Sequence, residues 1–192
     1  RDDEGGTDRG AVHIMFMNTD GSVDSTVEIN SSTTNGPELE NTDYFGRGIA
    51  NIGDLNGDGV NDLAVGAIND DMDENGDLGD SGDDRGALHI MYMNTNGSVK
   101  STVKIDDSTA NGPVLASADR FGSFVANIGD LDGDGVNDLA VGAYDDDMDE
   151  NGNSSGGTSR GALHIMYMNT NGSVKSTVEI NDSTANGPTL QN

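Results

Sequence analysis

One long block of sequence occurs about two and a half times in this 192-residue chain, and this repetition constrains the fold more than any other feature. The first unit spans residues 9–84, the second spans residues 85–159, and the third begins at Arg160 and stops before its second half. Each unit opens with Arg-Gly-Ala-(Val/Leu)-His-Ile-Met-(Phe/Tyr)-Met-Asn, and the second and third openings are identical. Because near-identical copies form the same supersecondary unit, the chain is predicted to be a row of equal units packed on one another.

Each complete unit contains four predicted β-strands and no predicted helix. In the first unit these strands are expected at residues 11–18, 23–29, 47–52 and 63–67. Along the first of them, apolar side chains occupy both alternating faces, so this strand is predicted to be buried on both faces between stacked sheets. In the later copies Asn96-Gly97 and Asn171-Gly172 favour a tight hairpin turn, because both residues accept a positive φ. The pattern predicts an all-β fold of four-stranded antiparallel blades, as in a β-propeller or a similar stack.

Residues 53–62 and their copy at 129–138 carry the spacing of oxygen ligands that Ca²⁺ prefers. Side-chain oxygens occur at loop positions 1, 3, 5 and 9, a glycine at position 6 allows a sharp turn, and position 7 would offer its backbone carbonyl. The predicted ligands are Asp54, Asn56, Asp58, Val60 and Asp62 in the first loop and Asp130, Asp132, Asp134, Val136 and Asp138 in the second. A helix–loop–helix site would need Glu at position 12, where Val65 and Val141 stand. The apolar run after each loop has β character, so a calcium loop joining two strands is predicted.

A second acidic stretch in each unit repeats part of this spacing. Oxygen-bearing side chains again fall at positions 1, 3 and 5 before a glycine, but position 9 is Gly79 or Ser155. The residues concerned are Asp71, Asp73 and Asn75 in the first unit and Asp147, Asp149 and Asn151 in the second. Two interpretations stay open for these stretches: a weaker second calcium site in each unit, or a solvated acidic loop.

The net charge of the chain indicates which classes of binding partner are favoured. It has 35 acidic and 9 basic residues, for a formal net charge of −26, which disfavours nucleic acid and anionic membranes and favours cations. No run approaches the roughly 18 apolar residues that a membrane span needs, so no membrane insertion is expected. The repeated apolar strands argue against an unstructured acidic polymer. No nucleophile–base arrangement, phosphate-binding glycine loop or basic patch is present, so no enzymatic activity is predicted.

Histidine and methionine recur in the opening strand of every unit. His13, His89 and His164 each lie without a cysteine or second histidine nearby, which gives too few ligands for zinc and favours a packed strand residue. The methionines of the same strands could bind a soft metal, but adaptable core packing is the favoured interpretation.

The segment that begins at Phe45-Gly46 and continues through the loop to Leu63-Ala64-Val65-Gly66-Ala67 resembles an FG-GAP repeat. Its copy from Phe121-Gly122 to Ala143 resembles the same repeat, although Ile68 and Tyr144 stand where the family motif ends in proline. Such repeats build the β-propellers of integrin α-subunits and occur in bacterial surface and secreted proteins. The resemblance implies four-stranded blades with Ca²⁺ in the hairpin between the first two strands, and an extracellular or cell-surface location.

The resemblance also implies a division of the chain into about two and a half blades. Residues 1–44 would form an outer half-blade, and residues 45–120 and 121–192 would each contain one blade. Because two and a half blades do not close a ring, we expect an excised fragment, or part of a larger stack or filament. The expected partners are other copies of the chain or further repeats of the same parent chain, together with surface protein or glycan ligands.

These features predict a calcium-stabilised extracellular segment with a structural or adhesive role, as the building unit of a filament or a long tandem array. The near-identity of the units favours this function over a single evolved binding pocket. Two alternatives stay open: a ligand-binding fragment of an integrin-like propeller, and a non-catalytic accessory domain of a secreted hydrolase.

Overall fold

The computed structural model describes residues 6–70, 83–146 and 159–189, and throughout these ranges the regular structure is β. The predicted all-β class is therefore confirmed, and within the described ranges there is no helix that could span a membrane. The ten strands are β1 Val12–Met17, β2 Val23–Ile29, β3 Phe45–Gly53, β4 Asp62–Ala67, β5 Ala87–Met93, β6 Val99–Ile105, β7 Phe121–Gly129, β8 Asp138–Ala143, β9 Ala162–Met168 and β10 Val174–Ile180.

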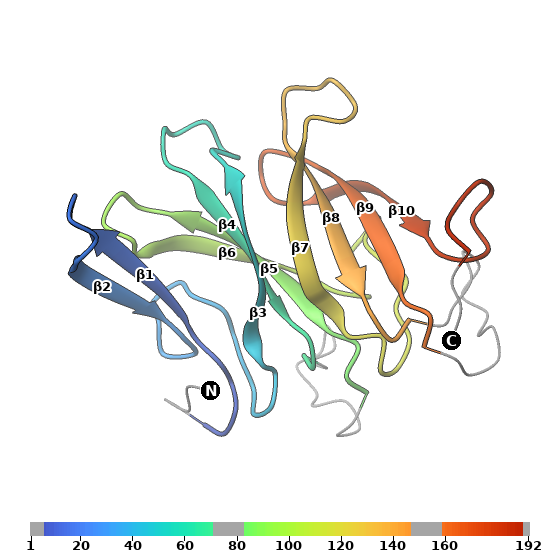
Figure 1. Cartoon of the computed structure of the whole chain (residues 1–192), viewed down its shortest axis with the longest axis horizontal. Helices are drawn as coiled ribbons and strands as arrows, with labels where there is room; N and C mark the ends of the chain where they lie inside the picture. Colours follow the sequence, from blue (N-terminus) through green and yellow to red (C-terminus); the bar gives the residue numbers. More distant parts are fainter. Residues whose placement is uncertain (1–5, 71–82, 147–158, 190–192) are drawn as a thin grey trace.

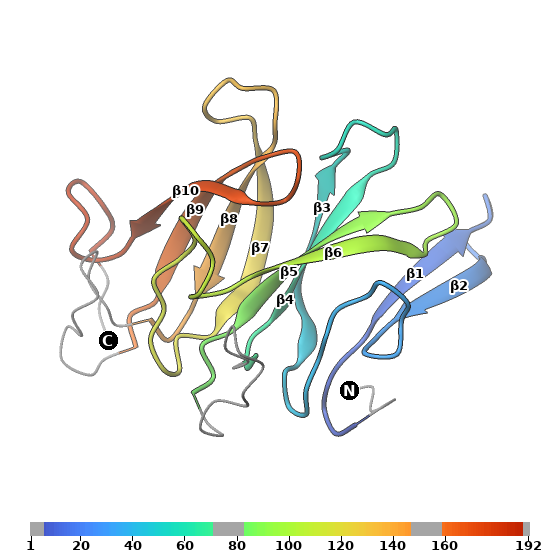
Figure 2. The same ribbon diagram turned by 180° about the vertical axis from the view of Figure 1, so that it is seen from behind.

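The strands form three antiparallel sheets in which neighbours in the sheet are neighbours in the sequence. Strands β1 and β2 make a two-stranded sheet, the half-blade. Strands β3-β4-β5-β6 make the first blade, and β7-β8-β9-β10 make the second. Figures 1 and 2 show from opposite sides that the first blade lies between the half-blade and the second blade. The predicted four-stranded antiparallel blades are thus present, while the exact domain boundaries proposed from the sequence stay a prediction.

The inner strand of each blade is longer than the sequence predicted. Strand β3 was expected at residues 47–52 but runs from Phe45 to Gly53, because Phe45 pairs with Ala67 of β4. The ladder is irregular between Phe45 and Ile49, where Gly46 has a φ of 93°. Phe45 also forms a parallel bridge with Gly10, and Phe121 forms the same bridge with Gly86. The Phe-Gly pair therefore joins each inner strand both to its own blade and to the segment that leads into the preceding sheet.

Two glycines let the blades approach each other closely. A Cβ at Gly66 of β4 would lie 1.9 Å from the carbonyl oxygen of Gly122 on β7, and a Cβ at Gly122 would lie 3.0 Å from the Cα of Gly66. Side chains at these positions would force the two backbones apart. Gly122 of Phe-Gly and Gly66 of Leu-Ala-Val-Gly-Ala are therefore packing residues of the contact between the first and second blades.

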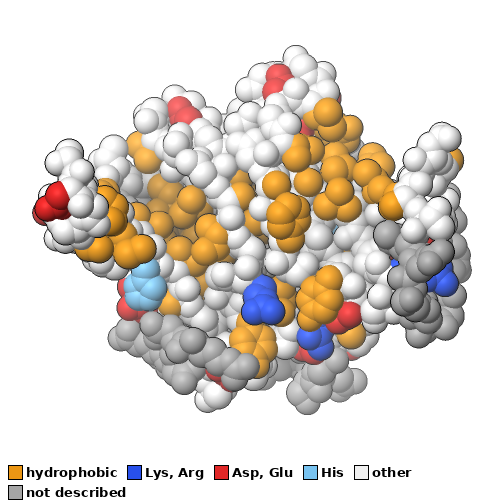
Figure 3. All heavy atoms as spheres, in the orientation of Figure 1, with side chains coloured by type: hydrophobic (Ala, Val, Ile, Leu, Met, Phe, Trp, Pro, Cys, Tyr) orange, Lys and Arg blue, Asp and Glu red, His pale blue; other side chains and the backbone are white. Residues whose placement is uncertain are grey.

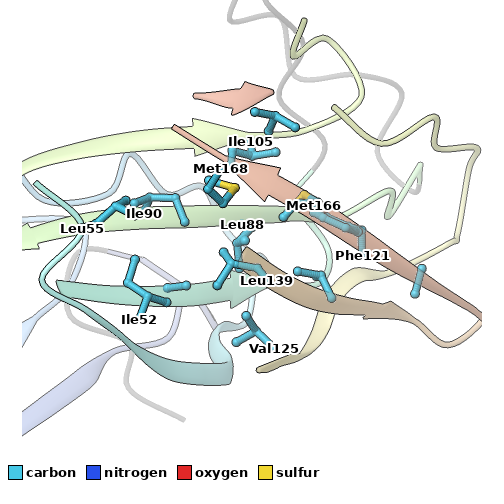
Figure 4. Packing of buried hydrophobic residues seen from close by; sticks show 14 of the residues in the cluster. Ile52, Leu55, Leu88, Ile90, Ile105, Phe121, Val125, Leu139, Met166 and Met168 are labelled. Atoms are coloured by element: carbon cyan, nitrogen blue, oxygen red, sulfur yellow. The ribbon is translucent and has the colours of Figure 1, made fainter. Parts of the chain in front are cut away.

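The hydrophobic core lies between the sheets and has two parts. One cluster joins the first and second blades, with side chains such as Ile52, Leu88, Phe121, Leu139 and Met166 directed toward one another from five strands (Figure 4). The other cluster joins the half-blade to the first blade. Full burial of one such aliphatic side chain stabilises the fold by about 1.5–3 kcal/mol, so these contacts are the main force that holds the sheets together.

The prediction that the opening strand is buried on both faces is correct for β5 and wrong for β1 and β9. All seven residues of β5 are buried, because the half-blade covers one face and the second blade covers the other. In β1 the side chains of Met15 and Met17 are 57% and 55% exposed. In β9 burial alternates, because only one face of this strand meets a neighbouring blade.

Polar contacts repeat across the two sheet-to-sheet contacts. The hydroxyl of Thr102 on β6 donates to the carbonyl of Asn35 at 2.8 Å, and Thr177 on β10 donates to Asn111 at the same distance. Both asparagines have a positive φ, which directs their Asn-Gly-Pro loop over the outer strand of the next blade. The hydroxyl of Tyr92 also donates to the carbonyl of Thr170. Burial, with a smaller effect of the Asp62 charge, raises the pKa of Tyr92 to about 12, so this donor stays neutral.

Candidate metal centre

The two predicted calcium loops join the inner strand of each blade to the next strand. Loop 54–62 connects β3 to β4, and loop 130–138 connects β7 to β8. Within the loops, the glycines have positive φ values of 76° and 90° at Gly57 and Gly59, and of 80° and 89° at Gly133 and Gly135. These turns lie in a backbone region that other residues rarely adopt, and they fold each loop tightly around its own acidic side chains.

Backbone N–H groups hold the loop carboxylates in place. Asp54 accepts hydrogen bonds from the amides of Asp58 and Gly59 at 2.9 and 2.7 Å. Asp130 makes the same contacts and also accepts from Gly133 at 2.7 Å. The side chain at position 3 of each loop accepts from the amide at position 5, and the side chain at position 5 accepts from the amide at position 7. The loops therefore present their oxygen atoms in a fixed arrangement.

The last acidic residue of each loop is buried and ties the loop to the blade. Asp62 accepts from the amide of Leu55 in its own loop and from the amide of Met93 on β5, both at 3.0 Å. Asp138 does the same with Leu131 at 2.8 Å and Met168 at 3.1 Å. Burial raises the pKa of Asp62 above its usual value, despite the lowering effect of the two amide donors. A cation beside this carboxylate would favour its charged form.

The two loops differ in how many carboxylates they bring together. In loop 130–138, oxygens of Asp130, Asp132 and Asp138 all lie within 4.8 Å of one another. Loop 54–62 has the neutral Asn56 in the place of Asp132. A cluster of hard oxygens of this kind suits Ca²⁺, and the residues present in both loops fit that ion. The assignment of the ten individual ligands, the valines at position 7 included, stays a prediction.

A lysine reaches each loop from the outer strand of the same blade. The Lys100 ammonium lies 2.7 Å from Asp58, and the Lys175 ammonium lies 2.6 Å from Asp132 and 2.8 Å from Asp134. The hydrogen bonds from these lysines lower the pKa of Asp58 and Asp134, and the carboxylates raise the pKa of both lysines. This contact was not predicted from the sequence, although the two lysines occupy the same position of their units, where the first unit has Asp24.

The weaker candidate residues at 71–75 and 147–151 lie outside the described residues. The structure therefore leaves both interpretations of these stretches as predictions.

Two of the three histidines belong to buried pairs with aspartate. Nε2 of His89 lies 3.4 Å from Asp70, and Nε2 of His164 lies 3.3 Å from Asp146. Each imidazole also meets the ring of the preceding Phe-Gly motif edge-on, with centroids 5.6 and 5.4 Å apart. These are the packed strand histidines that the sequence favoured. His13, in contrast, is exposed.

The first of these pairs carries an additional cation. The ammonium group of Lys104 lies 2.6 Å from Asp70. Burial opposes ionisation of Asp70, but the neighbouring imidazole of His89 and the charge of Lys104 outweigh it and lower the pKa of this carboxyl group. The sequence signal for both aspartates is their recurrence three residues after each Leu-Ala-Val-Gly-Ala run.

Comparison with known proteins agrees with this geometry. Residues 121–166, which include β7, loop 130–138 and β8, match the family model described as FG-GAP repeat. The chain is 39% identical to integrin alpha-4 of Xenopus laevis over 101 residues, which are 52% of this chain and 8% of that protein. It is 33% identical to integrin alpha-PS5 of Drosophila melanogaster over 99 residues, and 30% identical to integrin alpha-2 of Mus musculus over 108 residues. These matches cover 52% and 56% of this chain and 9% and 8% of the relatives, so the chain spans less than a tenth of their length. Residues 121–166 therefore match an FG-GAP repeat, and about half of the chain is similar to integrin alpha chains.

Proposed function

We propose that this chain is a calcium-stabilised segment of an extracellular or cell-surface protein, with a structural or adhesive role that involves no catalysis. The observation that carries the proposal is the convergence of Asp130, Asp132 and Asp138 within 4.8 Å, on a loop that lies inside the FG-GAP match. Loop 54–62 has the same strand context and the same pattern of amide donors. Its ligands to Ca²⁺ would be Asp54, Asn56, Asp58, Asp62 and the carbonyl of Val60, with the corresponding set in loop 130–138.

The proposed role of the ion is to stabilise the blades as well as the loops. Without a cation, each loop holds several carboxylates close together in a chain whose net charge is already −26. Asp62 and Asp138 connect the loops to β5 and β9 through buried hydrogen bonds, so an ion in the loop would also stabilise the sheet. With free Ca²⁺ at about 100 times its dissociation constant, each site would add about 2.7 kcal/mol to the free energy of unfolding.

Thermal unfolding in Ca²⁺ and in excess chelator tests the proposal. We expect chelation to lower the melting temperature, and re-addition of Ca²⁺ to restore it. The D130N variant should lose part of this calcium-dependent stabilisation while its melting temperature in chelator changes little. A matched titration with Mg²⁺ separates specific coordination from general screening of the negative charge. An identical melting temperature with and without Ca²⁺ would contradict the proposal.

We further propose that additional repeats, from the same parent chain or from another copy, cover the outer faces of the molecule. Met15 and Met17 are exposed on the half-blade, whereas the corresponding Met91 and Met93 are 0% and 5% exposed beneath it. On the opposite side of the molecule, Val178 of β10 is 48% exposed. Apolar faces of this kind are those that neighbouring repeats cover in a stack.

The state of association distinguishes a filament or tandem array from a ligand-binding propeller fragment. Sedimentation at increasing protein concentration, followed by electron microscopy, should show ordered end-to-end assembly if copies of this chain cover these faces. The double variant M15E/M17E should then remain monomeric. A wild-type chain that stays monomeric at all concentrations would instead favour the ligand-binding alternative, in keeping with its similarity to integrin alpha chains.

A further inference from the structure

A cavity of about 560 Å³ lies where the segment before β1 meets the start of β3 and the lower ends of β4, β7 and β8. Its wall includes Tyr44, Arg47, Ile68, Asn69, Arg120 and Tyr144. Figure 3 shows one face of the molecule in the orientation of Figure 1, and basic and hydrophobic side chains lie next to one another in its lower part. The cavity has the volume of a small-molecule site and combines apolar surface with few charged groups.

Arg47 differs from the other basic residues in its lack of an acidic partner within the described ranges. Every other lysine or arginine among the described residues has a carboxylate oxygen within 4.0 Å; these are Arg9, Arg85, Lys100, Lys104, Arg120, Arg160 and Lys175. Arg47 has no such partner within the described ranges, and its side chain is exposed. In a chain with 35 acidic residues, an arginine without a carboxylate is a position at which an external anion can bind.

The two repeats differ mainly at the wall of this cavity. Between Asp43 and Asp70 the first repeat differs from residues 119–146 at seven positions, and four of these seven lie in the wall of the cavity. The pairs are Tyr44 and Arg120, Arg47 and Ser123, Ile68 and Tyr144, and Asn69 and Asp145. Four of the exchanges fall in the wall of one cavity, which indicates a local requirement for these particular side chains.

The exchanges also explain why only one of the two arginines is available. In the second repeat, Arg120 is neutralised by Asp145 at 3.3 Å and by Asp84 at 3.5 Å, and it donates to the hydroxyl of Tyr144 at 2.7 Å. In the first repeat, the neutral Asn69 takes the place of this aspartate in the cavity wall. Arg120 therefore acts as a fixed part of the wall, while Arg47 keeps an uncompensated charge.

We propose that the cavity binds the carboxylate of a hexuronate, an acidic sugar. The planar guanidinium of Arg47 matches a carboxylate and can donate two parallel hydrogen bonds to it. Tyr44 and Tyr144 supply flat aromatic surface, and Tyr144 is 44% exposed, so the C–H groups of a rigid pyranose ring can pack against it. The site shares no residue with the loops at 54–62 and 130–138, so the proposal does not depend on calcium binding.

Chemical-shift titration of the isotope-labelled 192-residue chain with methyl glucuronoside tests the site. We expect shifts at residues 44–47 and 68–69, and none with methyl glucoside, which lacks the carboxylate. The variant R47S carries the residue found at the equivalent position 123 of β7, and Arg47 is exposed, so the variant should fold. Its affinity for the glucuronoside should fall at least about tenfold, in line with the loss of a charge-assisted hydrogen bond.

Two further variants control for charge. K100S removes one positive charge outside the cavity and should bind the glucuronoside as the wild type does. N69D places a carboxylate in the same cavity wall as Arg47, at the position that Asp145 occupies in the second repeat, and should weaken binding. Absence of shifts with the glucuronoside, or equal affinity of the wild type and R47S, would overturn the proposal.

A third probe, glutamate blocked at both ends, separates a sugar acid from an acidic peptide. Tighter binding of the blocked glutamate than of the glucuronoside would assign the cavity to an acidic peptide and would overturn the sugar proposal. Weaker binding supports the sugar. None of these outcomes bears on the calcium-dependent melting experiment.

Discussion

Strands β5 and β9 have the same seven residues, Ala-Leu-His-Ile-Met-Tyr-Met, but they differ in burial. In β5 every side chain is buried. In β9 the histidine and the two methionines are buried, while the residues on the opposite face are half-buried. The local sequence and the strand pairing are equal in the two places, so the difference comes from the neighbouring sheets. Burial in this fold is therefore a property of position in the stack, and equal substitutions in the two blades should have unequal effects.

The buried histidine–aspartate pairs should give the largest difference between the blades. We expect D70N to lower the free energy of unfolding by about 4 kcal/mol, because it removes the charged partner of both His89 and Lys104. D146N should cost less, because the position that corresponds to Lys104 is Glu179, which supplies no cation. Urea denaturation of both variants at neutral pH measures the comparison.

The effect of D70N should also depend on pH. The pKa of Asp70 is lowered from 3.8 in the folded state, so its stabilising effect is complete above that value and is lost as the pH falls through the folded-state pKa. The gap in stability between the wild type and D70N should therefore narrow under acidic conditions. A gap that is constant from pH 7 to about pH 2.5 would show that the charge of Asp70 contributes nothing.

Leucine truncation tests the difference in burial directly. L88A should cost about 3 kcal/mol, because Leu88 is fully buried between the first and second blades. L163A changes the same residue of the same strand sequence but should cost only about 1 kcal/mol, because Leu163 is half-buried. M91A and M166A are the matched controls, since both side chains are 0% exposed, and their costs should be similar. Equal losses for L88A and L163A would mean that another molecule covers β9 in solution.

The two loops should differ in calcium affinity because of one residue. N56D gives loop 54–62 the carboxylate that loop 130–138 already has, and D132N removes it there. On the proposed assignment, each change should alter the dissociation constant of its own loop by about tenfold, upward for D132N and downward for N56D. Calorimetric titration with Ca²⁺ would detect this exchange of the two affinities. Unaltered affinities would argue against position 3 as a ligand.

The smallest expected effect concerns the lysines at the loops. The Lys175 ammonium contacts two carboxylates of loop 130–138, whereas the Lys100 ammonium contacts one of loop 54–62. Because a bound cation would compete with these exposed contacts, K175S should tighten calcium binding about threefold and K100S should tighten it less. The same titration measures both variants. Weaker binding in K175S would instead indicate that the lysine helps to hold the ligands in position.

Local sequence patterns were sufficient to predict the strands and the hairpins of the described ranges. These features depend on the alternation of apolar and polar residues and on turn residues, and the same patterns occur in each repeat. Burial was predicted correctly for β5 and wrongly for β1 and β9, because it depends on a neighbouring sheet that the strand's own residues do not specify. The full length of β3 was missed for the same reason, since its first residue is held by Ala67 and by the bridge to Gly10.

Long-range polar contacts of the candidate site were also missed. Lys100 lies 42 residues from Asp58, and the pairing becomes visible only when β6 is placed beside the loop in the same blade. His89 lies on β5 and Asp70 follows β4, and their contact is likewise not evident from the sequence. The sequence does show one member of each pair, because the lysine or the aspartate recurs at the same distance from a motif in both repeats. Such recurrence identifies a residue that matters but not the partner that it meets.

The contact that Thr102 and Thr177 make with the preceding Asn-Gly-Pro loop has a consequence for how such a chain can change in length. Each unit carries the loop that reaches forward and the threonine that receives the loop from behind. Both sheet-to-sheet contacts in the described ranges are therefore made by the same loop and the same threonine of neighbouring units. Insertion or deletion of one whole unit would therefore recreate the same loop–threonine contact. Insertion or deletion of part of a unit would leave a loop without its threonine, or a threonine without its loop.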